Sequence, residues 1–353
     1  MKQTLFLTLL ICLLALAACS APPPQDDSTF TNVDLPTRPA QPTTATSAEA
    51  QTSPTAASAP AEASATPALA EASATPAPAK PAETQPPAPA ATQPPAAPTA
   101  GMALAPAAWQ ELPVIPEISA KAQQIYQHGQ ELGNNPKAFS KIGDCGSTPT
   151  WFLGDFDRGQ EHYRLGEYTQ LESVIQEFQG SYDRTSLAAR SGFNAASLFS
   201  PLWADRSQCQ PNETPLACEY RVHKPAYVFI MLGANDVWHP ENFEPQMRKI
   251  IEYSIENGVI PILSTKADNQ EGDGSLNATL ARLAAEYDVP LVNFWRATAF
   301  LPNRGLQEDN VHLTWGRNFF DDPQEMQRGW PIRNLTALQI LDAIWRSVAA
   351  PAQ

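Results

Sequence analysis

Four short polar clusters along the chain contain the side chains that acyl transfer requires. In chain order they are Gly143-Asp144-Cys145, Ser191-Gly192, Gly233-Ala234-Asn235-Asp236 and Asp309-Asn310-Val311-His312. His312 could accept the proton of a nucleophile, and Asp309, three residues earlier, could hold the imidazole in one tautomer and stabilise the imidazolium. The backbone N–H of Gly192 and the side-chain amide of Asn235 could bind the developing oxyanion. Together the four clusters indicate an acyl-transfer site without a metal.

Two residues are candidates for the nucleophile of such a site. Cys145 ends the first cluster, and Ser147 follows two residues later in the same small polar turn. A cysteine thiolate paired with an imidazolium is a strong nucleophile, which favours Cys145. Ser147 is the alternative nucleophile. A third interpretation is that Cys145 is an inert thiol in a site without catalytic activity.

The stretches around these clusters alternate between strand and helix patterns. The run at 226–232 has no charge and no polar alternation, which is typical of a strand buried on both faces of a parallel sheet. Similar patterns predict strands at 138–142, 259–264 and 289–294, and helices at 118–132, 169–179, 194–199, 245–257, 276–287 and 334–348. The alternation predicts an α/β fold, with a central parallel sheet covered by helices on both faces. Gly233 to Asp236 then lie at the carboxyl end of a strand, where such sheets bind ligands.

The four clusters, in this order, resemble the conserved blocks of the SGNH (GDSL-type) hydrolases, over about residues 138–316. The resemblance implies a flavodoxin-like three-layer α/β/α sandwich and the hydrolysis of acyl or acetyl esters. It also implies Gly192 and Asn235 as oxyanion donors, and Asp309 and His312 as the base pair. The sequence departs from the family at the nucleophile, because Cys145 stands where the family has serine. A thiol there is chemically competent, but it puts ester hydrolysis in doubt.

The amino-terminal part of the chain has a different character. An uncharged run from Thr4 to Ala18 follows Lys2 and resembles a secretory signal peptide, and Leu16-Ala-Ala-Cys19 resembles a bacterial lipobox. We therefore expect a lipoprotein signal peptide at 1–18 and lipidation of Cys19. No aromatic residue occurs between Phe30 and Trp109, so 19–105 is expected to be a disordered tether rich in Pro, Ala and Thr. A single hydrolase domain at 106–353 is expected to follow it, outside the cytoplasm and anchored to a bacterial membrane.

The remaining cysteines are candidates for a disulfide, and the histidines and the net charge bear on metal and nucleic-acid binding. Cys209 and Cys218 flank a short loop that a disulfide could close in an exported protein. The other histidines show no metal-ligand spacing, and the loop at 268–275 fails the calcium-loop pattern and is expected to be solvated. No nucleotide or cofactor motif is present, and the net charge of −14 argues against a nucleic-acid partner.

These observations predict a membrane-tethered hydrolase whose substrate is an ester-bearing small molecule or polysaccharide. The alternative is a catalytically silent module of the same fold that binds a glycan or a peptide. Three tryptophans follow the clusters closely and could either line a sugar-binding pocket or cover the edge of the sheet; they are Trp151, Trp238 and Trp315.

Overall fold

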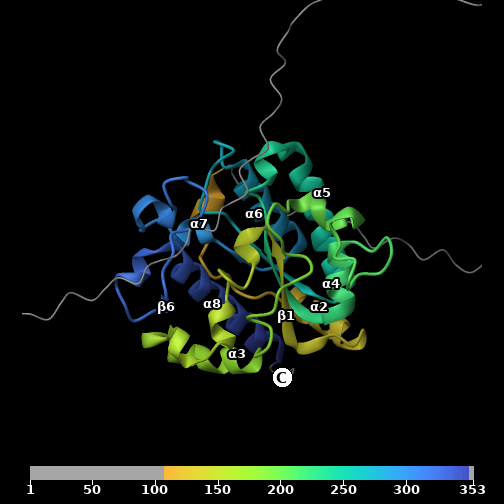
Figure 1. Cartoon of the computed structure of the whole chain (residues 1–353), viewed down its shortest axis with the longest axis horizontal. Coiled ribbons are helices and arrows are strands. Elements are labelled where there is room, and N and C mark those ends of the chain that lie inside the picture. The colour runs from red at the N-terminus through yellow and green to blue at the C-terminus, as the bar shows by residue number, and fades with distance from the viewer. Residues whose placement is uncertain (1–106, 350–353) are drawn as a thin grey trace, which may run out of the picture. The chain divides into compact units, whose positions relative to one another are not determined.

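The computed structural model describes residues 107–349. The centre of this region is a parallel sheet of four strands in the order β1-β3-β4-β5 (Figure 1). The strands are β1 (Asn135–Gly143), β3 (Pro225–Met231), β4 (Ile260–Ser264) and β5 (Leu291–Val292). A single parallel bridge between Gly143 and Ala189 adds a further rung on the free side of β1. The predicted α/β fold with a central parallel sheet is therefore confirmed.

Strand β3 is an interior strand of the sheet, between β1 and β4, and none of its side chains is charged. All seven of its residues are buried. Successive side chains of a strand point to opposite faces, so Tyr227 and Phe229 lie on one face of β3. The ring of Tyr227 contacts Tyr126 and Phe178, and the ring of Phe229 contacts Phe152. The long apolar run at 226–232 thus packs against aromatic side chains from three separate segments that precede it in the chain.

Helices cover both faces of the sheet. The helices α2 (Ala120–Glu131) and α3 (Glu172–Glu177) each contact α8 (Gly329–Ala349). The helix α5 (Pro240–Glu256) packs between α4 (Pro215–His223) and α6 (Ser275–Tyr287), since it contacts α6 directly and its Tyr253 stacks on Tyr220 of α4. Short helix α7 (Phe294–Ala297) follows β5 directly. The result is the three-layer arrangement that the sequence predicts.

Smaller elements complete the described region. A second sheet pairs β2 (Tyr163–Arg164) with β6 (Asn318–Phe319) in parallel. Short 3-10 helices occur throughout the loops, at η1 (Ala108–Glu111), η2 (Cys145–Ser147), η3 (Gly154–Asp157), η4 (Gln160–His162), η5 (Gly166–Leu171), η6 (Ala195–Phe199), η7 (Pro201–Trp203), η8 (Asp236–Trp238), η9 (Pro302–Gly305) and η10 (Glu325–Gln327).

Several predicted boundaries differ from the structure. The strand predicted at 289–294 has only two residues, because the chain turns into α7 at Phe294. The helix predicted from 245 begins at Pro240, so Pro245 lies inside α5 rather than at its first position. The helix predicted at 169–179 is the 3-10 helix η5 followed by α3, and that predicted at 194–199 is the 3-10 helix η6.

The sequence analysis missed α4 altogether. Its start nevertheless carries a usual signal, because the Thr214 side chain accepts the N–H of Ala217 and Pro215 occupies the first helical position. The helix predicted at 334–348 begins five residues earlier, at Gly329. These extra residues of α8 carry side chains into the pocket described below.

The expected signal peptide, the lipidated Cys19 and the tether at 19–105 lie outside the described residues. Within 107–349, none of the helices combines the length and apolar character needed to cross a bilayer. Cys209 and Cys218 form a disulfide in the structure. The disulfide ties the loop before α4 to a buried position on that helix.

Replacing both Cys209 and Cys218 by serine is expected to lower the free energy of unfolding by roughly 2–3 kcal/mol, because the short loop gains freedom in the unfolded chain. Urea denaturation followed by tryptophan fluorescence would measure the change. Adding a reductant should destabilise the wild-type protein by a similar amount and leave the double variant unchanged. A wild-type midpoint that does not respond to reductant would contradict the expectation.

Candidate active site

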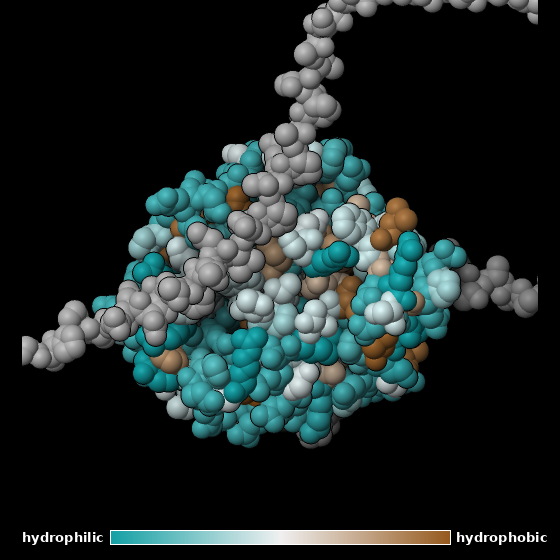
Figure 2. Space-filling view, in the orientation of Figure 1, coloured by the Kyte–Doolittle hydropathy of each residue, from teal (hydrophilic) through white to brown (hydrophobic). Residues whose placement is uncertain are grey.

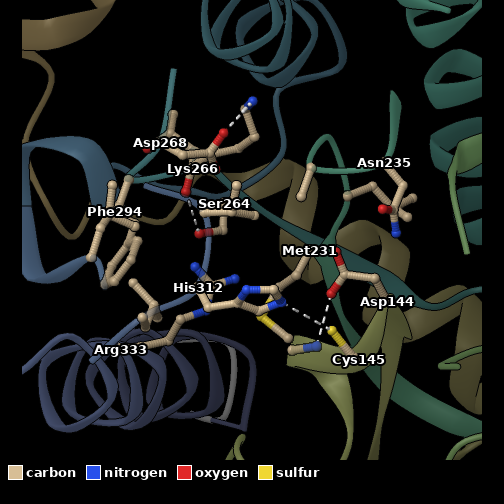
Figure 3. A pocket seen from close by; sticks show the side chains of 18 of the residues that line it. Asp144, Cys145, Met231, Asn235, Ser264, Lys266, Asp268, Phe294, His312 and Arg333 are labelled. Carbon is tan, nitrogen blue, oxygen red and sulfur yellow. Dashed lines mark hydrogen bonds and ion pairs between the residues drawn. The ribbon is translucent and has the colours of Figure 1, made fainter. Parts of the chain in front are cut away.

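A cavity of about 170 Å³ lies at the carboxyl ends of the parallel strands. Its walls come from the segments after β1, β3 and β4, from Phe294 after β5, from the loop at 306–313, and from α8 (Figure 3). Because all strands run in the same direction, their carboxyl ends meet at one edge and bring together residues far apart in the sequence. The cavity therefore lies where the sequence places the polar clusters.

Cys145 begins the 3-10 helix η2 directly after β1. Asp144 caps this turn, because its carboxylate accepts the backbone N–H of Gly146 at 2.8 Å. Burial raises the pKa of Asp144, while this hydrogen bond and the nearby Arg333 and His312 oppose the rise. Cys145 itself is half-buried, lines the cavity and has no disulfide partner. The cap thus fixes the turn that presents the thiol.

His312 lies opposite Cys145 and is held by Asp309. The Cys145 Sγ lies 4.0 Å from Nε2 of His312, and Nδ1 of His312 lies 2.6 Å from Oδ2 of Asp309. The other oxygen of Asp309 accepts the backbone N–H groups of Val311 and His312, at 2.9 and 3.0 Å. One carboxylate therefore orients the imidazole and shapes the loop that carries it (Figure 3).

The electrostatics of this trio favour a protonated imidazole. The hydrogen bond with Cys145 is the largest cause that raises the pKa of His312 to about 9, and Asp309 raises it further by hydrogen bonding and by its charge. Burial lowers the pKa of His312. The pKa of Asp309 is lowered, because hydrogen bonds from the His312 ring and from two backbone N–H groups outweigh the effect of burial. A protonated imidazole can donate a hydrogen bond from Nε2 towards the sulfur of Cys145.

The two predicted oxyanion donors differ in their positions. Asn235 lines the cavity, and its amide nitrogen donates one hydrogen bond to the carbonyl of Phe193 at 2.9 Å, which leaves its second N–H available. Gly192 is exposed in a turn closed by a hydrogen bond between Phe193 and Arg190, and its φ of 85° suits glycine there. Gly192 does not line the cavity in this structure.

Asp236 joins the two loops that carry the predicted oxyanion donors, a role that the sequence analysis did not assign. It is buried, and its two oxygens accept the backbone N–H groups of Ala195 and Gly233, at 2.9 and 3.0 Å. Burial is the main cause that raises its pKa, and the two hydrogen bonds oppose the rise. The carboxylate thus joins the segment after Gly192 to the loop that carries Asn235.

Ser147 and the three tryptophans lie apart from the cavity. Ser147 is fully buried, and its hydroxyl donates a hydrogen bond of 3.4 Å to the carbonyl of Ile142. Of the two candidate nucleophiles, Cys145 is therefore the one that faces His312. Trp151 stacks on the cavity residue Trp330 at 5.8 Å between ring centroids. Trp151, Trp238 and Trp315 are largely exposed and do not line the cavity.

The loop after β4 contributes charged residues that the sequence analysis did not place in the site. Lys266 lines the cavity, and its ammonium pairs with Asp268 at 2.9 Å and Glu271 at 2.7 Å. Lys266 and Asp268 are buried, so the prediction of a solvated loop at 268–275 is wrong for Asp268, whereas Asn269 is exposed as predicted. Gln270 is exposed, and its amide donates to the carbonyl of Asn310 at 2.9 Å, next to the His312 loop.

Comparison with known proteins identifies a related family and two relatives. Residues 146–315 match the model of the GDSL-like Lipase/Acylhydrolase family. Two Escherichia coli proteins, each named "Thioesterase 1/protease 1/lysophospholipase L1", are 28% identical over 97 residues, which cover 26% of this chain and 47% of theirs. The chain thus spans about half the length of the curated relatives that it matches. Residues 146–315 therefore carry a GDSL-like lipase/acylhydrolase domain, as the motifs of the sequence predict.

The solved structures to which the chain is similar include a lipase and an esterase. A GDSL-like lipase from Bacteroides thetaiotaomicron is 15% identical, covers 63% of this chain and 98% of its own, and gives a TM-score of 0.36. An acetylxylan esterase from Geobacillus stearothermophilus is 17% identical, covers 58% of this chain and 93% of its own, and also gives a TM-score of 0.36.

The pKa of His312 is expected to fall when either neighbour is replaced, because both Cys145 and Asp309 raise it towards 9. NMR titration of the imidazole resonances in wild type, Cys145→Ala and Asp309→Asn would measure the three values. The His312→Ala variant assigns the resonance, and the exposed His239, which lies outside the cavity, serves as an internal reference. Equal His312 titrations in all three proteins would contradict the proposed contacts.

Replacing Asp236 by asparagine is expected to destabilise the protein by about 1–3 kcal/mol, because one of the two buried N–H groups loses its acceptor. Urea denaturation would measure this loss. Asp273→Asn is a matched control, since Asp273 is exposed in the loop before α6 and should change stability little. Equal stability of the two variants would show that Asp236 does not hold the loops together.

Proposed function

We propose that this protein is a thiol-dependent hydrolase of small acyl esters and thioesters, which acts through Cys145, His312 and Asp309. The observation that carries the proposal is the arrangement of these three side chains at the cavity, with Sγ 4.0 Å from one ring nitrogen of His312 and Asp309 2.6 Å from the other. The match of residues 146–315 to a hydrolase family supports the reaction type. The serine that the family uses is replaced by a thiol in the same turn.

The proposed reaction begins when the Cys145 thiolate adds to the carbonyl carbon of the substrate. The developing oxyanion accepts a hydrogen bond from the free N–H of Asn235, and the Gly192 N–H is the second donor that the family resemblance implies. The His312 imidazolium then transfers its Nε2 proton to the leaving group as the carbon–heteroatom bond breaks, which leaves an acyl group on Cys145.

The second half of the reaction releases the acyl group. Neutral His312 accepts a proton from a water molecule as its oxygen adds to the acyl-thioester carbon. Collapse of this intermediate expels the Cys145 thiolate and releases the carboxylic acid, so the thiolate and the imidazolium are both restored. Asp309 stabilises the imidazolium in both halves, because its carboxylate stays in contact with Nδ1.

Because the proposed nucleophile is a sulfur atom, the rate of the reaction should depend strongly on the leaving group of the substrate. The first tetrahedral intermediate can expel either Cys145 or the leaving group, and a thiolate is the better leaving group than an alkoxide. Thioesters and aryl esters should therefore react faster than alkyl esters. The small cavity favours short acyl groups, such as acetyl. The lipobox and tether in the sequence support a location outside the cytoplasm, where acylated polysaccharide is one available substrate.

The purified full-length protein is expected to hydrolyse p-nitrophenyl acetate and short-chain acyl thioesters. Replacing Cys145 or His312 by alanine should lower the rate at least about 100-fold, since each removes a partner of the proton transfer. His239→Ala is the matched control, because this exposed histidine lies outside the cavity and should leave the rate unchanged. Mass spectrometry should also detect an acyl group on Cys145 during turnover.

The alkaline limb of the rate should lie near pH 9, where His312 loses the proton that it donates to the leaving group. The Asp309→Asn variant should show this limb at lower pH, because the pKa of His312 falls. Absence of turnover on every ester and thioester tested, together with no acyl adduct, would sink the proposal. Glycan binding by the same preparation would then favour the silent binding module.

A further inference from the structure

Arg333 is a cation of the cavity wall for which residues 107–349 provide no hydrogen-bond acceptor and no ion-pair partner. Arg333 projects from α8, is half-buried and lines the cavity. Among the described residues, none accepts a hydrogen bond from its guanidinium or forms an ion pair with it; its contacts are the aromatic faces of Phe294 and Phe152, at 4.7 and 5.7 Å from the ring centroids. A guanidinium has five N–H donors in a planar fork. Its donors are therefore open to a ligand in the cavity.

The other charged groups of the cavity wall already have partners. Lys266 is enclosed by Asp268 and Glu271, and the Asp144 carboxylate accepts the N–H of Gly146. Burial lowers the pKa of Arg333 to about 10, while Asp144 and Asp268 hold it up. Arg333 thus keeps its positive charge at neutral pH. It is a partly desolvated cation, and such groups bind anions more strongly than cations in open water.

The position of Arg333 separates it from the reacting oxygen. In the view of Figure 3, Arg333 and Phe294 lie on one side of His312, and Cys145 and Asn235 lie on the other. An anion at Arg333 is therefore a substituent of the substrate and not the oxyanion of the reaction. Apolar walls from Met231, Leu306 and Trp330 complete this part of the cavity. These walls suit a short hydrocarbon spacer between the anion and the reacting carbonyl.

We propose that the cavity selects short substrates that carry a carboxylate, and that Arg333 binds this carboxylate. The inference deepens the proposed function and rests on it for the identity of Cys145 as the reacting group. A guanidinium matches a carboxylate in a bidentate fork. A monoanion fits better than a phosphate, because the acidic Asp144 and Asp268 lie close enough to act on Arg333 and would repel a second negative charge.

The binding of the anion can be tested without any hydrolysis. Iodoacetate and iodoacetamide both alkylate a thiol by displacement of iodide, but only iodoacetate carries a carboxylate. The ratio of their rates at Cys145 in the full-length protein is measured by mass spectrometry of the peptide that contains Cys145. Cys209 and Cys218 are held in a disulfide and do not compete. We expect the ratio of the iodoacetate rate to the iodoacetamide rate to be higher at Cys145 than at a free model thiol.

Arg333→Met should lower the iodoacetate-to-iodoacetamide ratio at least about tenfold, because the loss of one close positive charge at an effective dielectric constant of about 20 exceeds that factor. Arg333→Lys should keep part of the preference. Arg346→Met is the matched control, since it removes the same charge from the exposed far end of α8 and should leave the ratio unchanged. His312 is retained in all three variants, so its own attraction for iodoacetate is constant. A ratio that does not change in Arg333→Met would overturn the proposal.

Protection of the wild-type thiol provides a measurement that does not depend on the folding of any variant. Propionate should slow the alkylation of Cys145 by iodoacetamide, whereas propionamide at the same concentration should not. Equal effects of the two compounds would overturn the proposal, and stronger protection by inorganic phosphate would overturn the choice of carboxylate. If the carboxylate preference depends on Arg333 but no ester or thioester is hydrolysed, the anion site stands and the proposed hydrolase function fails.

Discussion

The register between β1 and β3 is the constraint on which the site depends. Gly143 pairs with Met231 at the carboxyl ends of the two strands. A Cβ atom on Gly143 would lie 2.2 Å from the Ser147 hydroxyl and 2.3 Å from the Met231 carbonyl, so only glycine allows the strand and the following turn to approach so closely. Cys145 and Asn235 follow these paired residues by a few positions. The strand pairing therefore brings the thiol and the amide to the same edge.

His312 reaches the same edge without a long strand to position it. An antiparallel bridge between Leu306 and Leu313 closes the base of its loop, and the N–H of Gln307 donates to the His312 carbonyl at 2.8 Å. Asp309 and Gln270 add the side-chain bonds described above. The side-chain bonds of Asp309 and Gln270 are exposed, in contrast to the buried sheet under Cys145. The buried sheet therefore supports Cys145, while side-chain hydrogen bonds hold the loop of His312.

The sequence predicts those features that local patterns determine. The apolar run at 226–232 identifies the central strand, and the spacing of Asp309 and His312 identifies a pair that the structure holds in contact. Features that depend on tertiary packing are missed. The two-residue β5 depends on pairing with β4, and Arg333 has the sequence pattern of a charge on an amphipathic helix. Only the fold shows that Lys266 is paired and Arg333 is not.

The replacement of serine by cysteine agrees with the charge state of the histidine. A serine nucleophile needs a neutral imidazole, because its hydroxyl must give up a proton during attack. Here the contact with Cys145 is the largest cause that raises the pKa of His312 to about 9, so the imidazole is protonated before a substrate binds. A thiolate needs no base to remove a proton during attack, and the protonated ring can donate its proton directly to the leaving group. In the proposed mechanism Cys145 and the protonated His312 act as a pair, and Asp309, which would support a serine mechanism, orients the imidazole in this one.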